Sequence, residues 1–341
     1  MEKDLLTHLE LQQRQELLEL LRGYRRSCIL ITCTELGVFE AFDSGQASAQ
    51  ELASRLGTDP RGMTLLLDSA AALGLLEKRN GKYAHSPAAA ACLAGSSPYS
   101  LANFIKREGA FYRRWGNLTQ AVRTGQRPEE NVQDEKPEEW ARGFEYALYD
   151  LARPIAPLIA DALKLPEDRP LRVLDVGGGH GCYSLALARR YPNLTATVFE
   201  LPRVAPVTRE IIAAEGLVER VTVQEGDFQQ DDLGSGYDLA LLFGVLPGES
   251  PQGRARLIKK AFAALKPGGW IVLREFLLDA DRAGPPEAAL FALQMLLSTD
   301  HGGASTAEEL AGWLEEAGFT PPRSISLPAW AGTNLTVAKR P

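Results

Sequence analysis

The sequence predicts an α/β protein whose carboxyl-terminal half is built on a parallel sheet, preceded by a mainly helical amino-terminal domain. The first observation is the stretch from Leu171 to Cys182, where an alternating apolar strand runs into a glycine-rich turn and then a helical pattern. The second is the alternation of strand and helix patterns that continues from there. The third is that residues 1–98 carry short helical patterns and a single hairpin signal.

Length and composition are those of an ordinary globular chain of about two domains. The 341 residues are 45% hydrophobic and 24% charged, and the net charge of −7 argues against a nucleic-acid partner, which requires a basic face. No apolar run reaches the roughly 18 residues of a membrane helix, and the first residues lack a signal-peptide pattern, so we expect a cytoplasmic protein without a membrane partner. The cysteines, at positions 28, 33, 92 and 182, show no zinc-binding spacing, and no metal is predicted.

The amino-terminal domain, residues 1–98, is expected to hold several helices and one hairpin. The helices are expected over residues 4–22, 27–36, 48–56 and 61–73. Ser48 and Glu51 form a capping box, and Asp59-Pro60 starts the next helix, with Pro60 near its first turn. Asn80-Gly81 is a two-residue turn signal within a hairpin over residues 75–83.

Helix, turn, helix and hairpin together give the outline of a winged-helix domain, so DNA binding has to be weighed. The helix that would enter the groove carries Arg61 and Asp68, whose charges cancel, and it is otherwise mostly apolar. The first helices carry more apolar surface than so small a domain can bury alone. Dimerisation is therefore the favoured role.

Residues 99–165 are predicted to form a helical connector rich in aromatic side chains, interrupted by a loop over residues 124–137. These aromatic residues could fill a core, or they could line a pocket for an aromatic or hydrophobic substrate, and the sequence supports the two interpretations equally. Both interpretations stay open for each residue. The third predicted region, residues 166–341, is the cofactor-binding domain.

From Leu171 onward the expected strands cover residues 171–176, 195–200, 221–225, 237–243 and 269–276. The expected helices begin at Cys182 and then cover residues 207–215, 254–265, 287–297 and 306–318, with a closing hairpin formed by 323–327 and 333–338. Ligands of such sheets bind at the carboxyl ends of the strands. The residues that end each strand are therefore the candidates for a binding site.

Three of these strand ends carry residues suited to a nucleoside. The first strand leads into the turn that contains Asp175, Gly177, Gly179 and Gly181. This turn lacks the phosphate-loop pattern, and the dinucleotide pattern fails because position 182 is cysteine. The second strand ends at Glu200, whose carboxylate can accept both ribose hydroxyls. The third runs into Asp227 and Phe228, which can meet the amino group and the ring face of an adenine.

These motifs resemble those of S-adenosylmethionine-dependent methyltransferases of the caffeic acid and acetylserotonin O-methyltransferase family, in its bacterial small-molecule branch. The resemblance covers nearly the whole chain, and its main segments are Glu35-Leu-Gly-Val-Phe39, Leu174-Asp-Val-Gly-Gly-Gly-His-Gly181, Phe199-Glu-Leu-Pro202, Gly226-Asp-Phe228 and Leu265-Lys-Pro-Gly-Gly269. It implies a Rossmann-like methyltransferase sheet. It also implies that the winged-helix module makes a homodimer.

The resemblance implies S-adenosyl-L-methionine as the cofactor, S-adenosyl-L-homocysteine as the product, and no metal. It places the ribose at Glu200, the adenine at Asp227 and Phe228, and the methionine end at the glycine turn. Three residues beside these strand ends complete the predicted cofactor contacts: Leu201, Phe243 and Gly244. The predicted contacts of the small-molecule acceptor are Phe111, Trp115, Phe144, Leu148, Met295 and Leu296.

Methyl transfer to a hydroxyl group needs a general base, which relatives supply as a histidine after the fourth strand, oriented by acids. In this chain the histidine position is Pro247 and one acid position is Ser305, whereas the acid after the fifth strand is present as Glu275. Asp300 or His301 is the candidate to orient or deprotonate the substrate, with Glu275 nearby. Glu275, Asp300 and His301 are thus the predicted catalytic residues, although loop capping also explains the last two.

The missing histidine leaves other functions open. Some relatives methylate carbon, and others bind the cofactor but catalyse hydroxylation or decarboxylation. A cofactor-sensing winged-helix regulator is a third class, against which the uncharged recognition helix weighs. Nucleic-acid methyltransferases are disfavoured, because the turn after the fourth strand lacks their Pro-Pro-aromatic motif and no cysteine follows a proline. We therefore predict methyl transfer to a small aromatic or hydrophobic acceptor, with O-methylation favoured.

Overall fold

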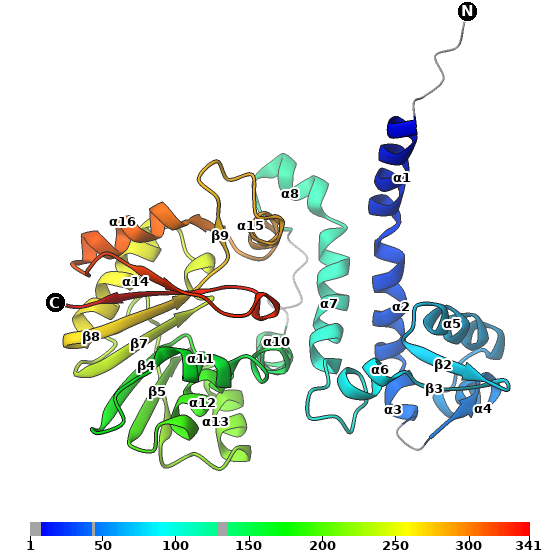
Figure 1. Cartoon of the computed structure of the whole chain (residues 1–341), viewed down its shortest axis with the longest axis horizontal. Coiled ribbons are helices and arrows are strands. Elements are labelled where there is room, and N and C mark those ends of the chain that lie inside the picture. Colours follow the sequence, from blue (N-terminus) through cyan, green and yellow to red (C-terminus); the bar gives the residue numbers. More distant parts are fainter. Residues whose placement is uncertain (1–7, 43–44, 129–135) are drawn as a thin grey trace, which may run out of the picture. The chain divides into compact units, whose positions relative to one another are not determined.

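The computed structural model of the protein describes residues 8–42, 45–128 and 136–341 (Figure 1). The chain divides into two compact units, Met1–Ala110 and Phe111–Pro341. The parts of the predicted first helix and of the predicted loop at 124–137 that fall on residues 4–7 and 129–135 lie outside the described residues. Among the described residues, no helix is long and apolar enough to cross a membrane.

The first unit is mainly helical. Its helices are α1 (His8–Arg22), α2 (Tyr24–Glu35), α3 (Val38–Ala41), α4 (Ala49–Leu56), α5 (Pro60–Ala72) and α6 (Pro87–Cys92), and α7 (Ala102–Trp115) runs on into the second unit. Its strands are β1 (Ala47–Ser48), β2 (Leu76–Arg79) and β3 (Lys82–His85). These pair antiparallel in the order β1-β3-β2.

The local signals of this unit act as expected. The Ser48 side chain caps the Glu51 amide, and the Glu51 carboxylate accepts the Ser48 amide 2.7 Å away. Asn80 and Gly81 both have positive φ, as the tight hairpin turn between β2 and β3 requires. Other details differ: α2 begins at Tyr24, before the expected start, and the short helices α3 and α6 and the strand β1 are additions that the sequence pattern did not indicate.

The second unit holds the predicted α/β sheet. Its strands are β4 (Leu171–Val176), β5 (Leu194–Glu200), β6 (Val221–Glu225), β7 (Tyr237–Phe243), β8 (Leu265–Arg274), β11 (Arg323–Ile325) and β12 (Leu335–Lys339), with a short parallel pair formed by β9 (Leu277–Leu278) and β10 (Ser305–Thr306). Its helices are α8 (Leu118–Thr124), α10 (Pro137–Ala152), α11 (Ala156–Leu163), α12 (Cys182–Arg190), α13 (Ala205–Ala214), α14 (Pro251–Ala264), α15 (Pro286–Ser298) and α16 (Ala307–Ala317), and the 3-10 turns are η1 (Leu246–Gly248) and η2 (Ala329–Ala331).

The seven strands of this sheet lie in the order β11-β12-β8-β7-β4-β5-β6. The five from β8 to β6 are parallel, whereas β12 and β11 add antiparallel at one edge as the predicted closing hairpin. β8 begins at Leu265, before the expected Gly269, because Leu265 already pairs with Tyr237 of β7. β8 also ends at Arg274, so that Glu275 stands just beyond the strand.

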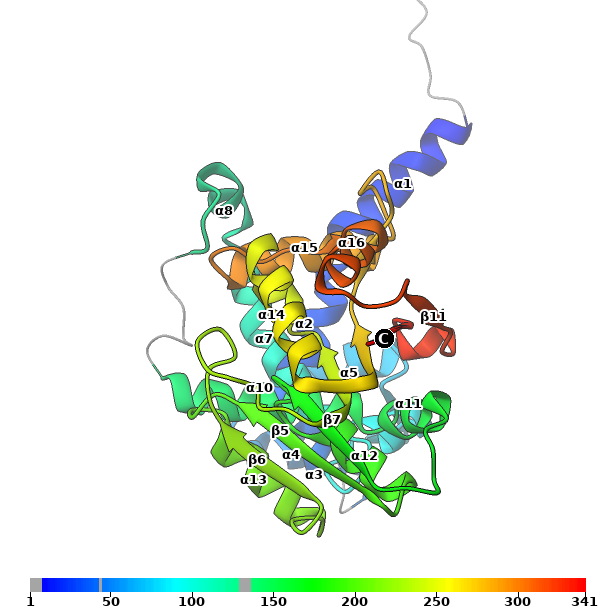
Figure 2. The same cartoon turned by 90° about the vertical axis from the view of Figure 1, so that its left-hand side faces the viewer.

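Helices cover both faces of this sheet (Figures 1 and 2). On one face α11, α12 and α13 bury a core with alternate residues of the strands, such as Val173 and Val198. On the other face α14 and α16 pack against the intervening residues, such as Leu174 and Leu242. This alternation follows from the two-residue period of a strand whose two faces are both buried. The carboxyl ends of β4, β5 and β7 are thereby held at one edge.

Candidate active site

The glycine turn after β4 is shaped by backbone conformations and contacts that exclude larger residues. Gly177, Gly179 and Gly181 have φ angles of 61°, 49° and 66°, a region that residues with a Cβ rarely adopt. A Cβ on Gly177 would lie 2.7 Å from Val245 Cγ2, and one on Gly179 would overlap Glu145 Oε2. The predicted turn therefore exists as a close approach between backbone and its neighbours, and α12 begins directly after it.

Glu200, at the end of β5, is fixed by backbone donors. The amide of Gly179 donates to Oε1 at 3.1 Å, and the amide of Leu201 donates to Oε2 at 2.6 Å. Burial raises the pKa of Glu200 to about 7, while these two amides act to lower it. This arrangement fixes the side chain against the glycine turn, as a ribose-binding carboxylate requires. Leu201 contributes through its backbone.

Asp175 and His180 support the turn from inside. Asp175 is 1% exposed and accepts the Ser184 hydroxyl at 2.7 Å, while its Oδ1 has no hydrogen-bond partner among the described residues. Burial raises its pKa to about 6. The Nδ1 of His180 accepts the Cys182 amide at 3.0 Å, and burial lowers the pKa of this ring to about 4, so the imidazole is neutral at neutral pH.

The remaining predicted cofactor contacts lie at neighbouring strand ends. The carboxylate of Asp227 accepts the Gln229 amide and the Gln230 side chain, each at 2.9 Å, which closes the turn after β6 and leaves Phe228 half-buried. Phe243 ends β7 and packs edge-on against Tyr183 at 4.8 Å between ring centres. Gly244 follows it with a φ of 69°.

One acidic residue at this turn has no counterpart in the sequence-based prediction. Glu145 on α10 is 6% exposed and packs against Gly179, and its Oε2 has no hydrogen-bond partner among the described residues. It stands on the buried stripe of α10 that also includes Ala141 and Tyr149. A charged residue on an otherwise apolar stripe is the signal that could have identified it.

The turn contains what S-adenosylmethionine needs. The cofactor carries a nucleoside, which Glu200 and the Asp227 turn can hold, and it brings positive charge. The buried carboxylates of Asp175 and Glu145 have unpartnered oxygens, and the groups that shift their pKa include no cation among the described residues. A cationic ligand would compensate these carboxylates. The residues present therefore fit the predicted cofactor.

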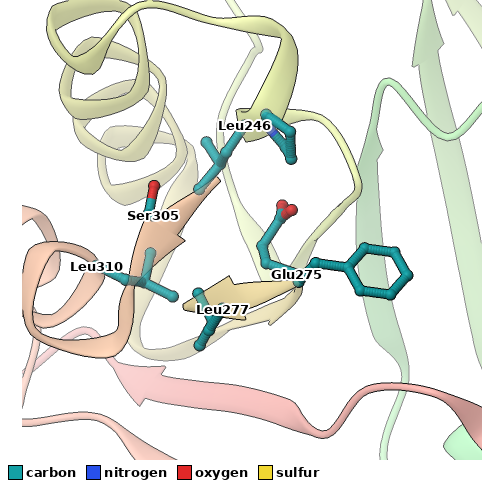
Figure 3. A pocket seen from close by; sticks show the side chains of 7 residues that line it. Leu246, Glu275, Leu277, Ser305 and Leu310 are labelled. Carbon is teal, nitrogen blue, oxygen red and sulfur yellow. The ribbon is translucent and has the colours of Figure 1, made fainter. Parts of the chain in front are cut away.

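A small pocket of about 10 Å³, room for about one water molecule, surrounds Glu275 just beyond the end of β8 (Figure 3). It is lined by Leu246, Pro247, Glu275, Phe276, Leu277, Ser305 and Leu310. Pro247 is buried in the turn after β7, and its carbonyl oxygen accepts the Gly303 amide at 2.9 Å. Pro247 thus joins two loops at the position where the resemblance implied a histidine.

Glu275 is the one titratable side chain that lines this pocket. It is 9% exposed, its carboxylate points toward Leu246 (Figure 3), and neither oxygen has a hydrogen-bond partner among the described residues. Burial raises its pKa to about 8, opposed by the amides of Leu246 and Gly244 and by the charge of Arg254. A wider groove of about 690 Å³ between the starts of α15 and α16 and the β11–β12 hairpin also reaches Glu275.

Arg254 on α14 was not predicted. It is 4% exposed, and it donates to the Leu246 carbonyl at 2.9 Å, the Gly303 carbonyl at 2.7 Å and the Ser305 hydroxyl at 2.5 Å. It therefore ties the turn after β7 to the loop before α16. The hydroxyl of Ser305, at the position where the resemblance implied an acid, accepts a hydrogen bond from this guanidinium.

Asp300 and His301 lie at the surface rather than at the Glu275 pocket. Asp300 is 68% exposed and pairs with Arg127 at 2.8 Å, and His301 is also exposed. Neither residue lines the pocket around Glu275. Their catalytic role stays a prediction.

The predicted acceptor contacts lie on α7, α10 and α15. Trp140 connects two of them, packing edge-on against Phe111 and parallel to Phe144, each at 6.1 Å between ring centres. The indole N–H of Trp115 donates to Gln294 of α15 at 2.6 Å. Leu148, Met295 and Leu296 are half-buried. None of the six lines the Glu275 pocket, so their contact with an acceptor also stays a prediction.

Comparison with known proteins adds two family models. Residues 141–320 match the O-methyltransferase domain, and residues 18–95 match the O-methyltransferase dimerisation domain. In the described residues, no group of three or more His, Cys, Asp or Glu side chains is placed to hold a metal ion.

Individual relatives agree with these models. The chain is 34% identical to 3-hydroxy-5-methyl-1-naphthoate 3-O-methyltransferase of Streptomyces sahachiroi, over 94% of each chain. It is 30% identical to the tetracenomycin polyketide synthesis 8-O-methyl transferase of Streptomyces glaucescens, over 94% of this chain and 95% of the relative. The structure of human N-acetylserotonin methyltransferase in complex with SAM superposes with a TM-score of 0.87 at 28% identity, over 98% of this chain and 99% of that one.

Proposed function

The chain belongs to the family of S-adenosylmethionine-dependent O-methyltransferases, and we propose that it methylates a hydroxyl group on a small fused-ring aromatic acceptor. The observation that carries this proposal is the glycine turn with the amide-bound Glu200, in the same sheet whose strand β8 is followed by the buried Glu275. The two Streptomyces relatives are named for O-methylation of a naphthoate and of a tetracenomycin polyketide, which supports the acceptor class. Hydroxylation, decarboxylation and gene regulation are not favoured by these relatives.

In this proposal the bound cofactor supplies a methyl group that is activated by its sulfonium. The glycine turn holds the methionine end and Glu200 holds the ribose, while Leu246, Phe276 and Leu277 surround the Glu275 carboxylate with apolar side chains. Glu275 accepts the proton of the acceptor hydroxyl as the oxygen attacks the methyl carbon. Its pKa of about 8 is near the pH at which the enzyme would work, which suits a general base.

Asp300 and His301 are the alternative residues for orienting or deprotonating the acceptor. Both lie in the loop that Arg254 and Pro247 hold through Gly303. An acceptor that approaches Glu275 from the side of this loop would reach them. The aromatic residues on α7 and α10 and the half-buried residues on α15 are proposed as the far wall of the acceptor site.

We further propose a homodimer formed through a winged-helix-like first unit, in the cytoplasm. The dimerisation family model supports self-association, and α1 exposes five leucines, an apolar surface that a partner helix would cover: Leu9, Leu11, Leu17, Leu20 and Leu21, at 63%, 50%, 66%, 80% and 70% exposure. Light scattering of the full chain tests this, with a molecular mass of twice the monomer as the expected result.

Methyl transfer can be tested directly. The purified chain is incubated with S-adenosylmethionine labelled in its methyl group and a panel of hydroxylated naphthoates and larger fused-ring phenols, followed by mass spectrometry. We expect one labelled methyl ether on at least one phenol. A chain that binds neither S-adenosylmethionine nor S-adenosylhomocysteine in calorimetry would contradict the proposal.

A further inference from the structure

Glu145 is a buried acidic side chain that reaches the glycine turn from outside the sheet. It projects from α10, with Ala141 and Tyr149 beside it on the same buried stripe, and packs so closely on Gly179 that a Cβ there would overlap its Oε2. The position of the Glu145 carboxylate therefore depends on residue 179 being a glycine. The carboxylate occupies the space that a side chain would otherwise fill.

Within the described residues, a hydrogen-bond donor lies beside only one of the two oxygens of the Glu145 carboxylate. The backbone amide of His180 faces the group, whereas Oε2 is buried and has no hydrogen-bond partner among the described residues. The other charge that acts on it is the carboxylate of Glu200, which is repulsive. Burial, followed by the charge of Glu200, raises the pKa of Glu145 to about 8. In the part of the chain that the structure describes, no cationic side chain compensates it.

We propose that Glu145 binds the α-ammonium group of the cofactor's methionine moiety and is therefore a determinant of cofactor specificity. The inference rests on the proposed function, which places the methionine end at this turn. Oε2 lacks a hydrogen-bond donor, and an ammonium group supplies three whereas a sulfonium supplies none. The unpartnered oxygen thus selects the ammonium over the other positive charge of the cofactor.

This assignment predicts which ligands depend on Glu145. S-adenosylmethionine and S-adenosylhomocysteine both carry the ammonium group, and only the former carries the sulfonium. 5′-Methylthioadenosine has the same nucleoside but neither charge. Comparing the affinities of these three compounds therefore distinguishes the contribution of the ammonium group from that of the sulfonium, and both from that of the nucleoside.

The test is isothermal calorimetry of the full chain with these three ligands, comparing the wild type with Glu145→Gln. Glutamine keeps the size and one acceptor oxygen but removes the charge, so the ionic hydrogen bond becomes a neutral one. We expect affinity for both S-adenosylmethionine and S-adenosylhomocysteine to fall by on the order of tenfold, with affinity for 5′-methylthioadenosine unchanged. Glu138→Gln, an exposed acid on the same helix, is the matched control and should change none of the three.

Other outcomes contradict the inference in distinguishable ways. Loss confined to S-adenosylmethionine would assign Glu145 to the sulfonium, and loss of all three ligands would give it a structural role. Unchanged affinity for all three would leave it without a part in binding. Retained binding of 5′-methylthioadenosine shows that the variant is folded, and a wild type that binds none of the ligands would overturn the proposed function itself.

Discussion

The two halves of the site, at the glycine turn and at the turn after β7, are built in different ways. In the cofactor half Glu200 is held by two backbone amides, and the glycine conformations leave no room for other residues. In the acceptor half the carboxylate of Glu275 faces the amides of Leu246 and Gly244 without a full hydrogen bond among the described residues, and Pro247 and Ser305 stand where the resemblance implied a histidine and an acid. The backbone geometry of the cofactor half therefore suits one kind of ligand. In the acceptor half, the side chains can change while the loops keep their positions.

Arg254 is expected to give the largest effect, because it holds those loops. Arg254→Met would keep much of the volume but leave the carbonyls of Leu246 and Gly303 without their donor and Glu275 without its nearby positive charge. We expect the free energy of unfolding to fall by about 3 kcal/mol in urea denaturation. Arg256→Met on the exposed side of α14 is the control, and an equal change in both variants would show that Arg254 has no special part.

Substitution of Gly179 is expected to have a nearly equal effect, which appears in ligand binding. Gly179→Ala adds a Cβ that overlaps Glu145 at a φ of 49°, so the turn must move. Affinity for S-adenosylhomocysteine should fall by about 100-fold or more in calorimetry. Gly181→Ala lies in the same turn with a similar φ of 66°, but its added Cβ would come no closer than 3.5 Å to its neighbours, so it measures backbone strain without a close contact. Equal affinities in the two variants would mean that the close contact is unimportant.

The pH dependence of stability tests the buried charge at the cofactor half. The pKa of Glu145 rises from 4.5 to about 8 on folding, so its contribution to stability is complete below about pH 4.5 and is lost as the pH rises through 8. The ligand-free wild type should therefore lose free energy of unfolding over this range, and Glu145→Gln should lose less, with a difference of about 2 kcal/mol at pH 9. Parallel curves for the two proteins would contradict the buried ionisation. Saturating S-adenosylmethionine should reduce this difference in the free energy of unfolding between the wild type and Glu145→Gln.

Asp300 and His301 provide the smallest expected effects. Asp300 is 68% exposed and its pair with Arg127 is a surface ion pair, which contributes little to stability. Steady-state kinetics of Asp300→Ala and His301→Ala should show kcat within about threefold of the wild type if Glu275 is the base. A loss of about 100-fold in either variant would instead move the catalytic group to this loop and establish the alternative.

The cofactor half could be predicted from the sequence because its signals are local. A strand that ends in glycines, and acids at the ends of the next strands, fix positions through chain topology alone, and the structure places Glu200 against Gly179. The sheet itself followed from the same strand and helix periodicity, with errors only at ends such as that of β8. Such errors arise because pairing with a neighbouring strand decides where a strand begins.

The contacts of Glu145 and Arg254 could not be predicted, since each depends on residues far away in the chain. Glu145 meets Gly179 through the packing of α10, and Arg254 meets Ser305 through the return of the chain after α15. Composition and periodicity show only that a charged residue stands on a buried stripe. Which distant residue contacts that buried charged side chain is decided only in the folded chain.

The most direct test of the site is the pH profile of methyl transfer in a single turnover, with wild type and Glu275→Gln loaded with labelled S-adenosylmethionine and a phenol from the acceptor panel. The wild-type rate should rise with pH and level off above about 8, the pKa of Glu275. Glu275→Gln should be slower by about 100-fold or more and lose that rise, while its affinity for the cofactor stays unchanged. A glutamine variant with the wild-type rate and pH profile would show that Glu275 does not take the proton.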